Sequence, residues 1–389
     1  MVAEYSGTGG PPRRRRACLV KATVLALAAV AAGGLVWWWL QPIYPGEHWE
    51  WQAPEAAGFS KTKLDEFARK ARGAGCFVQG GKMIYGWGQI DRLTDIASLS
   101  KPIYAHLTFK ALETGRISSL DDKIIRWVPE IKDLNPALGY KDRDITFRHL
   151  LDQTSGYGLV EKPGEAFAYN DYATGLLVWT LFYRVYGFSP KHYDDLINGP
   201  LLGEAIGFED RPTATYRGMN FLHARGRICI SARDLARFAL LYLRDGVWRG
   251  HRVLRRDLFE QATGEALPVD FPRTSGQAAE DLSTQGWYSI GGEKNQKGHA
   301  GCLGYFWWHN HITPAGTRFL PDAPPGTFLG SGYSGQMSMV IIPELDFIAV
   351  WLDAYEWTGQ CWSPLDQIGR FKVNDMIREL LAARTAPSR

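Results

Sequence analysis

The chain has 389 residues, of which 45% are hydrophobic and 22% are charged, as in an ordinary globular protein. Its formal net charge of +3 is unevenly placed. Residues 1–40 hold five basic side chains and one acidic side chain, and the rest of the chain holds 39 basic and 40 acidic ones. The main body therefore lacks the basic surplus of a nucleic-acid-binding protein, and we expect no nucleic-acid partner.

The N-terminal segment has the pattern of a membrane anchor. Residues 22–40 carry no charge, follow the basic run Arg13–Arg16 and end near three consecutive tryptophans. Nineteen helical residues rise about 28 Å, close to the thickness of the hydrocarbon core. We predict a basic cytoplasmic segment over 1–21, one transmembrane helix over 22–40 and an extracytoplasmic remainder. The alternative is a secretory signal cleaved near 29–31, but the apolar run continues past that point.

A linker and two Ser-x-x-Lys sequences follow. Residues 41–56 contain three prolines and are predicted to link the anchor to a soluble domain over 57–385. Ser60 in the first Ser-x-x-Lys is predicted to cap a surface helix over 63–72. Ser98 in the second precedes an apolar helical run that ends at Gly115. Lys101 then lies about one turn after Ser98, where its amine reaches the hydroxyl. A buried lysine can accept that proton because burial disfavours its charged form, so Ser98 is a candidate nucleophile.

The first half contains two further features that bear on chemistry. Residues 145–156 predict a short amphipathic helix and a loop, in which His149 is expected to hold the loop rather than to catalyse. Tyr169 and Asp171 lie just before an apolar helix over 175–186. A tyrosine there can share the serine's proton if a neighbouring ammonium lowers its pKa.

The remaining elements follow from hydrophobic periodicity and turn residues. They are a β-hairpin over 76–87, a short capped helix over 119–129, a turn and amphipathic helix over 226–238, a turn and short apolar run over 248–254, a polar loop over 264–286, two strands over 335–343 and 347–352, and a closing helix over about 366–382.

The five cysteines leave their own chemistry open. Cys18 lies at the membrane edge, and Cys76, Cys229, Cys302 and Cys361 lie in the outer domain. An oxidising compartment permits disulfides among the four outer ones, whereas free buried thiols are equally consistent with the sequence. No two cysteines have the spacing of a metal site, and we expect no metal.

These motifs, in this order, resemble the serine β-lactamase and penicillin-binding-protein superfamily over about residues 55–380. The class C-like branch of β-lactamases, D-alanyl-D-alanine carboxypeptidases, D-aminopeptidases and esterases is the most similar. Ser98–Lys101 resembles the nucleophile motif of that branch, and residues 169–171 resemble its Tyr-x-Asn motif. Residues 149–156 resemble the loop before the second motif, and residues 231–238 resemble the helical-domain signature. The resemblance implies an α/β fold of the β-lactamase/transpeptidase type. Its antiparallel sheet would be flanked by N- and C-terminal helices, with a mostly helical region over about 98–285.

Two departures from that family concern substrate recognition. Asp171 stands where the family usually has asparagine, so it accepts hydrogen bonds but lacks an amide donor. The third motif, usually Lys-Thr-Gly or His-x-Gly, is placed at Gly330-Ser331-Gly332 because paired strands follow it. His299-Ala300-Gly301 is a rival match in poorer context. If the first placement is right, the cation that recognises a substrate carboxylate is missing, which favours an esterase or amidase.

The resemblance implies that Ser98 forms an acyl-enzyme while Lys101 and Tyr169 share proton transfer. The N–H groups of Ser98 and Tyr333 would form the oxyanion hole. Substrate-binding positions would be Asp171, Gly330, Ser331 and Gly332, and no cofactor would be needed.

We therefore expect a membrane-anchored serine hydrolase that acts on a small-molecule or cell-wall-derived ester or amide. The alternatives are an inactive cell-wall or ligand-binding protein on the same fold, and a β-lactamase or D-alanyl-D-alanine carboxypeptidase. An aromatic pocket of Tyr305, Trp307, Trp308 and Tyr333 is possible, although these rings are equally typical of a core.

Overall fold

The computed structural model describes residues 42–215, 227–264, 266–282, 301–358, 362–363 and 373–385. The chain divides into two units, residues 1–43 and 44–389, and the fold below is that of the second. The predicted anchor over 22–40 lies outside the described residues. Within those residues, no helix combines the length and the apolar character that crossing a bilayer needs.

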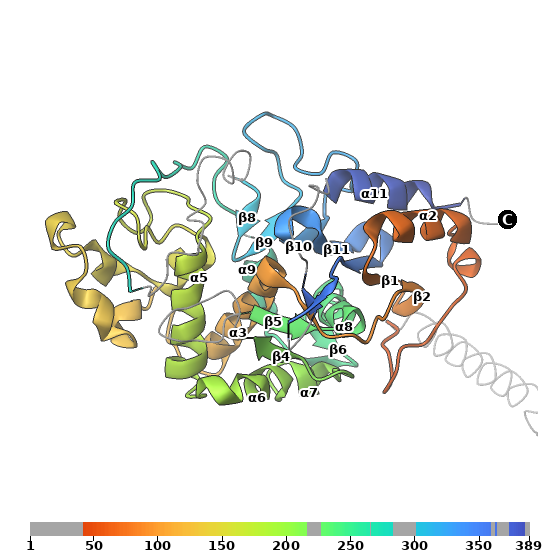
Figure 1. Cartoon of the computed structure of the whole chain (residues 1–389), viewed down its shortest axis with the longest axis horizontal. Coiled ribbons are helices and arrows are strands. Elements are labelled where there is room, and N and C mark those ends of the chain that lie inside the picture. The colour runs from red at the N-terminus through yellow and green to blue at the C-terminus, as the bar shows by residue number, and fades with distance from the viewer. Residues whose placement is uncertain are drawn as a thin grey trace, which may run out of the picture. The chain divides into compact units, whose positions relative to one another are not determined.

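A seven-stranded antiparallel sheet forms the centre of the domain (Figure 1). The predicted hairpin and the two predicted C-terminal strands all belong to it. Its strands, in spatial order, are β2 (Lys82–Trp87), β1 (Ala74–Gln79), β12 (Phe347–Leu352), β11 (Met337–Ile342), β10 (Phe328–Gly332), β9 (Trp307–His309) and β8 (Leu303–Gly304).

Both faces of the sheet are buried, which explains why its central strands have continuous apolar sequences. On β12, Phe347, Ala349 and Trp351 pack into one core cluster, whereas Ile348, Val350 and Leu352 pack into the other. This alternation is the two-residue period of a strand. Each fully buried large apolar side chain stabilises the fold by about 1.5–3 kcal/mol.

Helices cover the two faces. The terminal helices α2 (Lys61–Ala71) and α11 (Val373–Ala382) pack together on one face, as Figure 1 shows. Helix α8 (Ala232–Leu243) packs against β1, β11 and β12 on the other. This arrangement confirms the predicted sheet flanked by N- and C-terminal helices. The closing helix begins in the described residues at Val373, and 366–372 lie outside them.

The region between β2 and β8 is richest in helix but also contains strands. Besides α8, its α-helices are α3 (Lys101–Glu113), α4 (Phe147–Leu151), α5 (Asp171–Val178), α6 (Tyr193–Asn198), α7 (Gly203–Ile206) and α9 (Arg256–Gly264). A second sheet has the order β13 (Glu356–Trp357), β14 (Trp362–Ser363), β3 (Thr94–Asp95), β5 (Arg227–Ile230) and β4 (Thr213–Thr215). A small hairpin joins β6 (Val247–Trp248) to β7 (His251–Arg252).

Two local predictions differ from the structure. Residues 119–129 form no α-helix. Lys123 has an extended backbone and forms an antiparallel bridge with Thr146, and only the 3₁₀ turns Ile124–Arg126 and Pro129–Asp133 follow it. The predicted linker is also part of the domain from Tyr44 on. Trp51 forms a parallel bridge to Met83 on β2, and the buried Arg237 of α8 donates to the Glu47 carbonyl oxygen at 2.8 Å. The linker therefore covers the edge of the main sheet.

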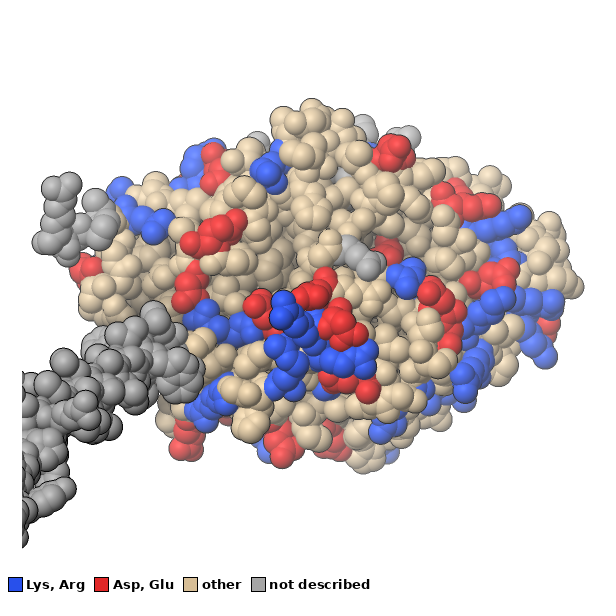
Figure 2. Space-filling view, turned by 180° about the vertical axis from the view of Figure 1, so that it is seen from behind, with Lys and Arg blue, Asp and Glu red and all other residues tan. Residues whose placement is uncertain are grey.

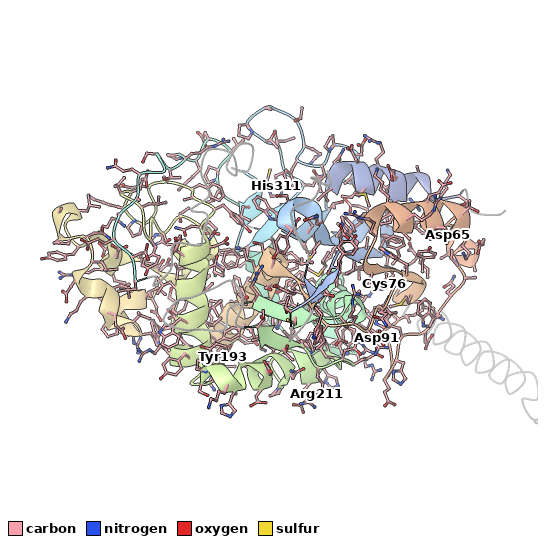
Figure 3. The ribbon with its side chains drawn as sticks, viewed as in Figure 1. Asp65, Cys76, Asp91, Tyr193, Arg211 and His311 are labelled. Carbon is pink, nitrogen blue, oxygen red and sulfur yellow. The ribbon has the colours of Figure 1, made fainter. Side chains whose placement is uncertain are left out.

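Of the outer cysteines, two are free buried thiols and one forms a disulfide. Cys76, labelled in Figure 3, and Cys302 are free and buried, and the Cys76 thiol points toward the Ala232 carbonyl oxygen at 3.6 Å. Cys229 on β5 is disulfide-bonded, and its partner lies outside the described residues. Burial raises the pKa of Cys302 to about 11, so that thiol stays protonated at neutral pH.

The surface carries charges of both signs. Figure 2 shows Lys and Arg side chains beside Asp and Glu side chains in the same clusters on one face of the molecule. This mixture matches the near-zero net charge of residues 41–389. The absence of a nucleic-acid partner stays a prediction.

Candidate active site

Ser98 and Lys101 lie where a tight turn becomes a helix. Ser98 belongs to the 3₁₀ turn Ala97–Ser100, and α3 begins directly after it at Lys101. The Lys101 Nζ donates to Ser98 Oγ at 3.1 Å. Lys101 is only 3% exposed, whereas Ser98 is partly accessible. The turn therefore presents a serine hydroxyl to solvent with a buried amine behind it.

The second motif contributes the other neighbours of that amine. Asp171 is the first residue of α5, and its Oδ1 accepts from Lys101 Nζ at 2.8 Å. The Lys101 ammonium also lies 4.5 Å from the centre of the Tyr169 ring. Asn170 between them caps α5, accepting from the Ala173 N–H at 3.1 Å. Because Asn170 caps the helix, Tyr169 before it and Asp171 after it both lie next to Lys101.

Charge and burial act on Lys101 in opposite directions. Burial lowers the pKa of its ammonium most strongly, but the Asp171 carboxylate and the Tyr169 hydroxyl together raise it by more. The net pKa of Lys101 lies above that of an ordinary lysine. The sequence argument considered burial alone, which would favour a neutral amine. The structure holds a charged one in the resting site.

The third motif is packed against the nucleophile turn. A Cβ at Gly330 would lie 2.6 Å from Leu99 Cδ1 and 3.0 Å from Pro102 Cγ. A Cβ at Gly332 would lie 2.6 Å from the Ile96 carbonyl oxygen. Both positions of β10 are glycine because larger residues would displace the turn that carries Ser98. Ser331 faces the other way, with its Oγ 3.3 Å from Ser338 Oγ.

The remaining candidates have mainly structural environments. His149 Nδ1 accepts from the Thr146 N–H at 3.2 Å and completes the cap of α4, so the ring holds this loop as expected. Tyr305 and Trp307 are buried in the core. Trp308 is buried in the other core cluster and also stacks on Tyr169, with ring centres 6.1 Å apart. Of the rival third motif, His299 and Ala300 lie outside the described residues.

Two residues near the site were missed by the sequence reasoning. Asp95 on β3 accepts from the Ala97 N–H at 2.9 Å, directly beside Ser98. Arg227 on β5 donates to the Tyr333 hydroxyl at 2.7 Å. Neither residue belongs to a recognisable motif, and only long-range pairing of β3 with β5 brings them together.

No group of three or more potential metal ligands occurs in the described part of the chain. Two cavities in this part of the chain, of about 230 Å³ and 450 Å³, are lined by residues other than Ser98, Lys101 and Tyr169.

Comparison with known proteins supports the same fold. No curated protein sequence matches the chain. Solved structures similar to it include a penicillin-binding protein homologue from Caulobacter crescentus, with 15% identity, a TM-score of 0.54 and coverage of 85% of this chain and 98% of that one. EstCE1, described as a hydrolase with promiscuous acyltransferase activity, has 15% identity, a TM-score of 0.52 and coverage of 84% and 99%. A class C β-lactamase has 15% identity, a TM-score of 0.51 and coverage of 84% and 96%.

At these identities the structural matches define the fold and leave the substrate open. The family model described as Beta-lactamase matches residues 61–352, which include the nucleophile turn, the second motif and β10. With this match over most of its length, the chain belongs to the beta-lactamase family.

Proposed function

We propose that the chain is a serine hydrolase that cleaves an ester or amide bond through an acyl-enzyme on Ser98. The observation that carries this proposal is the contact of a buried Lys101 amine with both Ser98 Oγ and Asp171. A merely structural lysine has no need of a half-exposed serine partner, whereas a nucleophile needs a nearby group that can handle its proton.

The chemistry balances with residues of this chain alone. Ser98 Oγ bonds to the substrate carbonyl carbon, and its proton passes to Lys101 Nζ in those molecules whose Lys101 amine is neutral, with Tyr169 beside it sharing the proton. The carbonyl oxygen, now negative, is stabilised by the N–H groups of Ser98 and Tyr333. The bond to the leaving group breaks as that proton is returned to it. Water then attacks the acyl-enzyme by the reverse proton path and releases the acid.

The third motif favours an ester over a β-lactam or a D-alanyl-D-alanine peptide. The glycine at 330 leaves no side chain there to pair with a substrate carboxylate, and the packing of Leu99 and Pro102 leaves no room for a larger one. The likeness to EstCE1, a hydrolase with promiscuous acyltransferase activity, is consistent with acyl transfer on Ser98, and the β-lactamase and penicillin-binding-protein likenesses are of similar strength.

Labelling with a fluorophosphonate tests the proposal. The purified chain and its Ser98→Ala variant are treated with the probe, and the labelled peptide is mapped by mass spectrometry. We expect label on the Ser98 peptide of the parent and none there in the variant. Ser60→Ala is the matched control and should label like the parent. A folded parent that takes no label would overturn the hydrolase and favour an inactive ligand-binding protein.

A substrate series then separates the candidate activities. We expect turnover of short p-nitrophenyl esters to exceed that of nitrocefin and of a D-alanyl-D-alanine dipeptide by at least tenfold in kcat/KM. Faster nitrocefin hydrolysis would instead identify a β-lactamase, and release of D-alanine a carboxypeptidase.

We further propose that the domain works outside the cytoplasm, held by the apolar segment 22–40. Two observations support this: the uncharged run behind four arginines and the disulfide at Cys229, because disulfides persist mainly in oxidising compartments. The full chain should stay with membranes after an alkaline carbonate wash. Release into the soluble fraction with residues 1–31 removed would show a cleaved signal instead.

A further inference from the structure

The backbone is strained beside both predicted oxyanion donors. Ala97 precedes Ser98 with a φ of 48°, and Tyr333 itself has a φ of 47°. Residues other than glycine rarely adopt this left-handed conformation, and it persists only where surrounding contacts enforce it. Some structure must therefore hold each of these two positions.

Strand β3 and strand β5 hold the first position. The Asp95 carboxylate accepts from the Ala97 N–H at 2.9 Å, and Asp95 is 1% exposed. On β5, the Ile228 carbonyl oxygen accepts from the Ile96 N–H, and the Ile228 N–H donates to Ser100 Oγ, both at 3.1 Å. The nucleophile turn is thus fixed to the second sheet before and after Ser98.

One guanidinium reaches both positions. Arg227 begins β5, and its Nη1 donates to the Tyr333 hydroxyl at 2.7 Å. The Arg227 Nη2 lies 3.4 Å from Asp95 Oδ2. The guanidinium also lies 5.7 Å from the centre of the Tyr333 ring. A single side chain therefore connects the acid that holds Ala97 with the tyrosine that carries the second donor.

The two backbone segments are already in contact, so small movements matter. A Cβ at Gly332 would lie 2.6 Å from the Ile96 carbonyl oxygen and 3.2 Å from the Leu99 nitrogen. Misplacing a reacting group by about 1 Å can cost about 100-fold in rate. A network that fixes both segments would therefore affect the transition state more than the binding of substrate.

The guanidinium is charged and enclosed. Its side chain is 14% exposed. Burial lowers the pKa of Arg227 most, but Asp95 and Tyr333 raise it by more, so the net pKa lies above the ordinary value. A buried ion pair by itself is weak evidence for stability, because the cost of removing both charges from water offsets their attraction. Its connection to both strained residues is what indicates a role in the reaction.

We propose that Arg227 is a positioning residue for acyl transfer, which sets the spacing of the Ser98 and Tyr333 N–H groups through Asp95 and the Tyr333 hydroxyl. This inference rests on the proposed hydrolase function. It assigns Arg227 no contact with substrate, so it differs from a cation that binds a substrate carboxylate.

Three single variants and one double variant test it in the full chain with p-nitrophenyl acetate. Tyr333→Phe removes the hydroxyl and keeps the N–H, and we expect kcat to fall about tenfold with KM changed less than threefold. Arg227→Met should lower kcat about 10- to 100-fold, and Arg227→Lys should restore part of it. The double variant R227M/Y333F should be no slower than R227M, because both changes break one network.

Arg244→Met is the matched control. The Arg244 side chain is 13% exposed and is paired with Asp346, in the turn between β11 and β12. It should keep kcat within twofold while losing the ion pair of a similarly buried guanidinium, whose partner Asp346 is more exposed than Asp95. If Y333F and folded R227M both keep kcat within threefold of the parent, the proposal is overturned. If R227M does not fold, Y333F decides alone.

Hydrogen exchange separates this proposal from the hydrolase function. In Y333F and R227M, we expect peptides covering 95–100 and 330–336 to exchange at least tenfold faster, with no change for R244M in those peptides. A parent that hydrolyses no ester while the variants show this faster exchange would overturn the hydrolase and leave the network supported. Unchanged exchange in both peptides would overturn the positioning role, whatever the activity.

Discussion

The chain contains the same spacing, Ser-x-x-Lys, twice, and the structure uses the two in opposite ways. Ser60 has an extended backbone, and its Oγ accepts from the Lys63 N–H at 3.5 Å to cap α2. The Lys63 side chain then turns away to the Ala382 carbonyl oxygen at 2.7 Å. Ser98 instead lies inside a 3₁₀ turn, where the Lys101 amine points back at its hydroxyl.

The difference shows that spacing alone does not create a nucleophile. At the first site the lysine is on the surface and the serine satisfies a helix N-terminus. At the second the lysine is buried and meets two polar partners from another part of the chain. Burial and a long-range carboxylate distinguish the two sites, and four predictions test that distinction.

The largest expected effect is the loss of the Lys101 amine. Lys101→Met should lower kcat/KM for p-nitrophenyl acetate about 10²- to 10⁴-fold, because general acid–base groups contribute on that scale. Lys63→Met, the equivalent change at the other serine, should stay within twofold. Steady-state kinetics on both variants measures this. Equal effects of the two substitutions would contradict the comparison.

Asp171→Asn should change the pH dependence of the reaction. The Asp171 carboxylate raises the pKa of Lys101, so its replacement by a neutral amide should lower that pKa. A charged ammonium cannot accept the serine proton, so the rise of kcat/KM with pH should move to lower pH in the variant. Profiles of kcat/KM that extend above the ordinary lysine pKa of about 10.4 provide the measurement. A shift to higher pH would show that Asp171 acts in another way.

Gly330→Ala should disturb the nucleophile turn without touching its reactive atoms. The added methyl group meets Leu99 and Pro102, and overpacking of this kind costs about 1–3 kcal/mol in unfolding free energy. Activity should fall about tenfold along with it. Gly264→Ala in α9 is the control, since a Cβ there meets no described atom within 4 Å. Similar behaviour of the two variants would argue against tight packing at β10.

The smallest effect concerns the other serine. Ser60→Ala removes a helix cap and should cost about 1 kcal/mol of stability, or about 2 °C in Tm, with kcat unchanged. Differential scanning calorimetry measures the change in Tm, and an ester assay on the same preparation measures kcat. Loss of activity at unchanged Tm would reverse the roles assigned to the two serines.

Much of the main sheet was accessible from sequence, because β12 is wholly apolar, β11 is apolar apart from Ser338, and β1–β2 is a local hairpin. The second sheet was not, since its strands have two to four residues and pair Thr94 with Ile230 across the chain. No local periodicity exists in such short segments. The 3₁₀ turns after α3 were missed for a related reason, because single turns leave no repeating pattern.

At the site, the motifs identified Ser98, Lys101, Tyr169 and Asp171, and the structure brings these four residues together. The charge state of Lys101 depended on the balance of burial against Asp171, which sequence does not show. Asp95 and Arg227 depended on a strand pairing between distant segments. The sequence thus identified the site residues that belong to a motif, and it missed those that only a long-range contact brings to the site.

The double-sided burial of β11 and β12 also bears on how the chain reaches its native state. Met337–Ile342 and Phe347–Leu352 are uncharged, rich in β-branched or aromatic residues and joined by the four residues 343–346. Such segments associate with one another between chains while they are unprotected. Their protection needs α8 on one side and α2 with α11 on the other, and α2 and α11 come from opposite ends of the domain. Refolding from denaturant should therefore compete with aggregation until the last helix docks, and yield should rise as protein concentration falls.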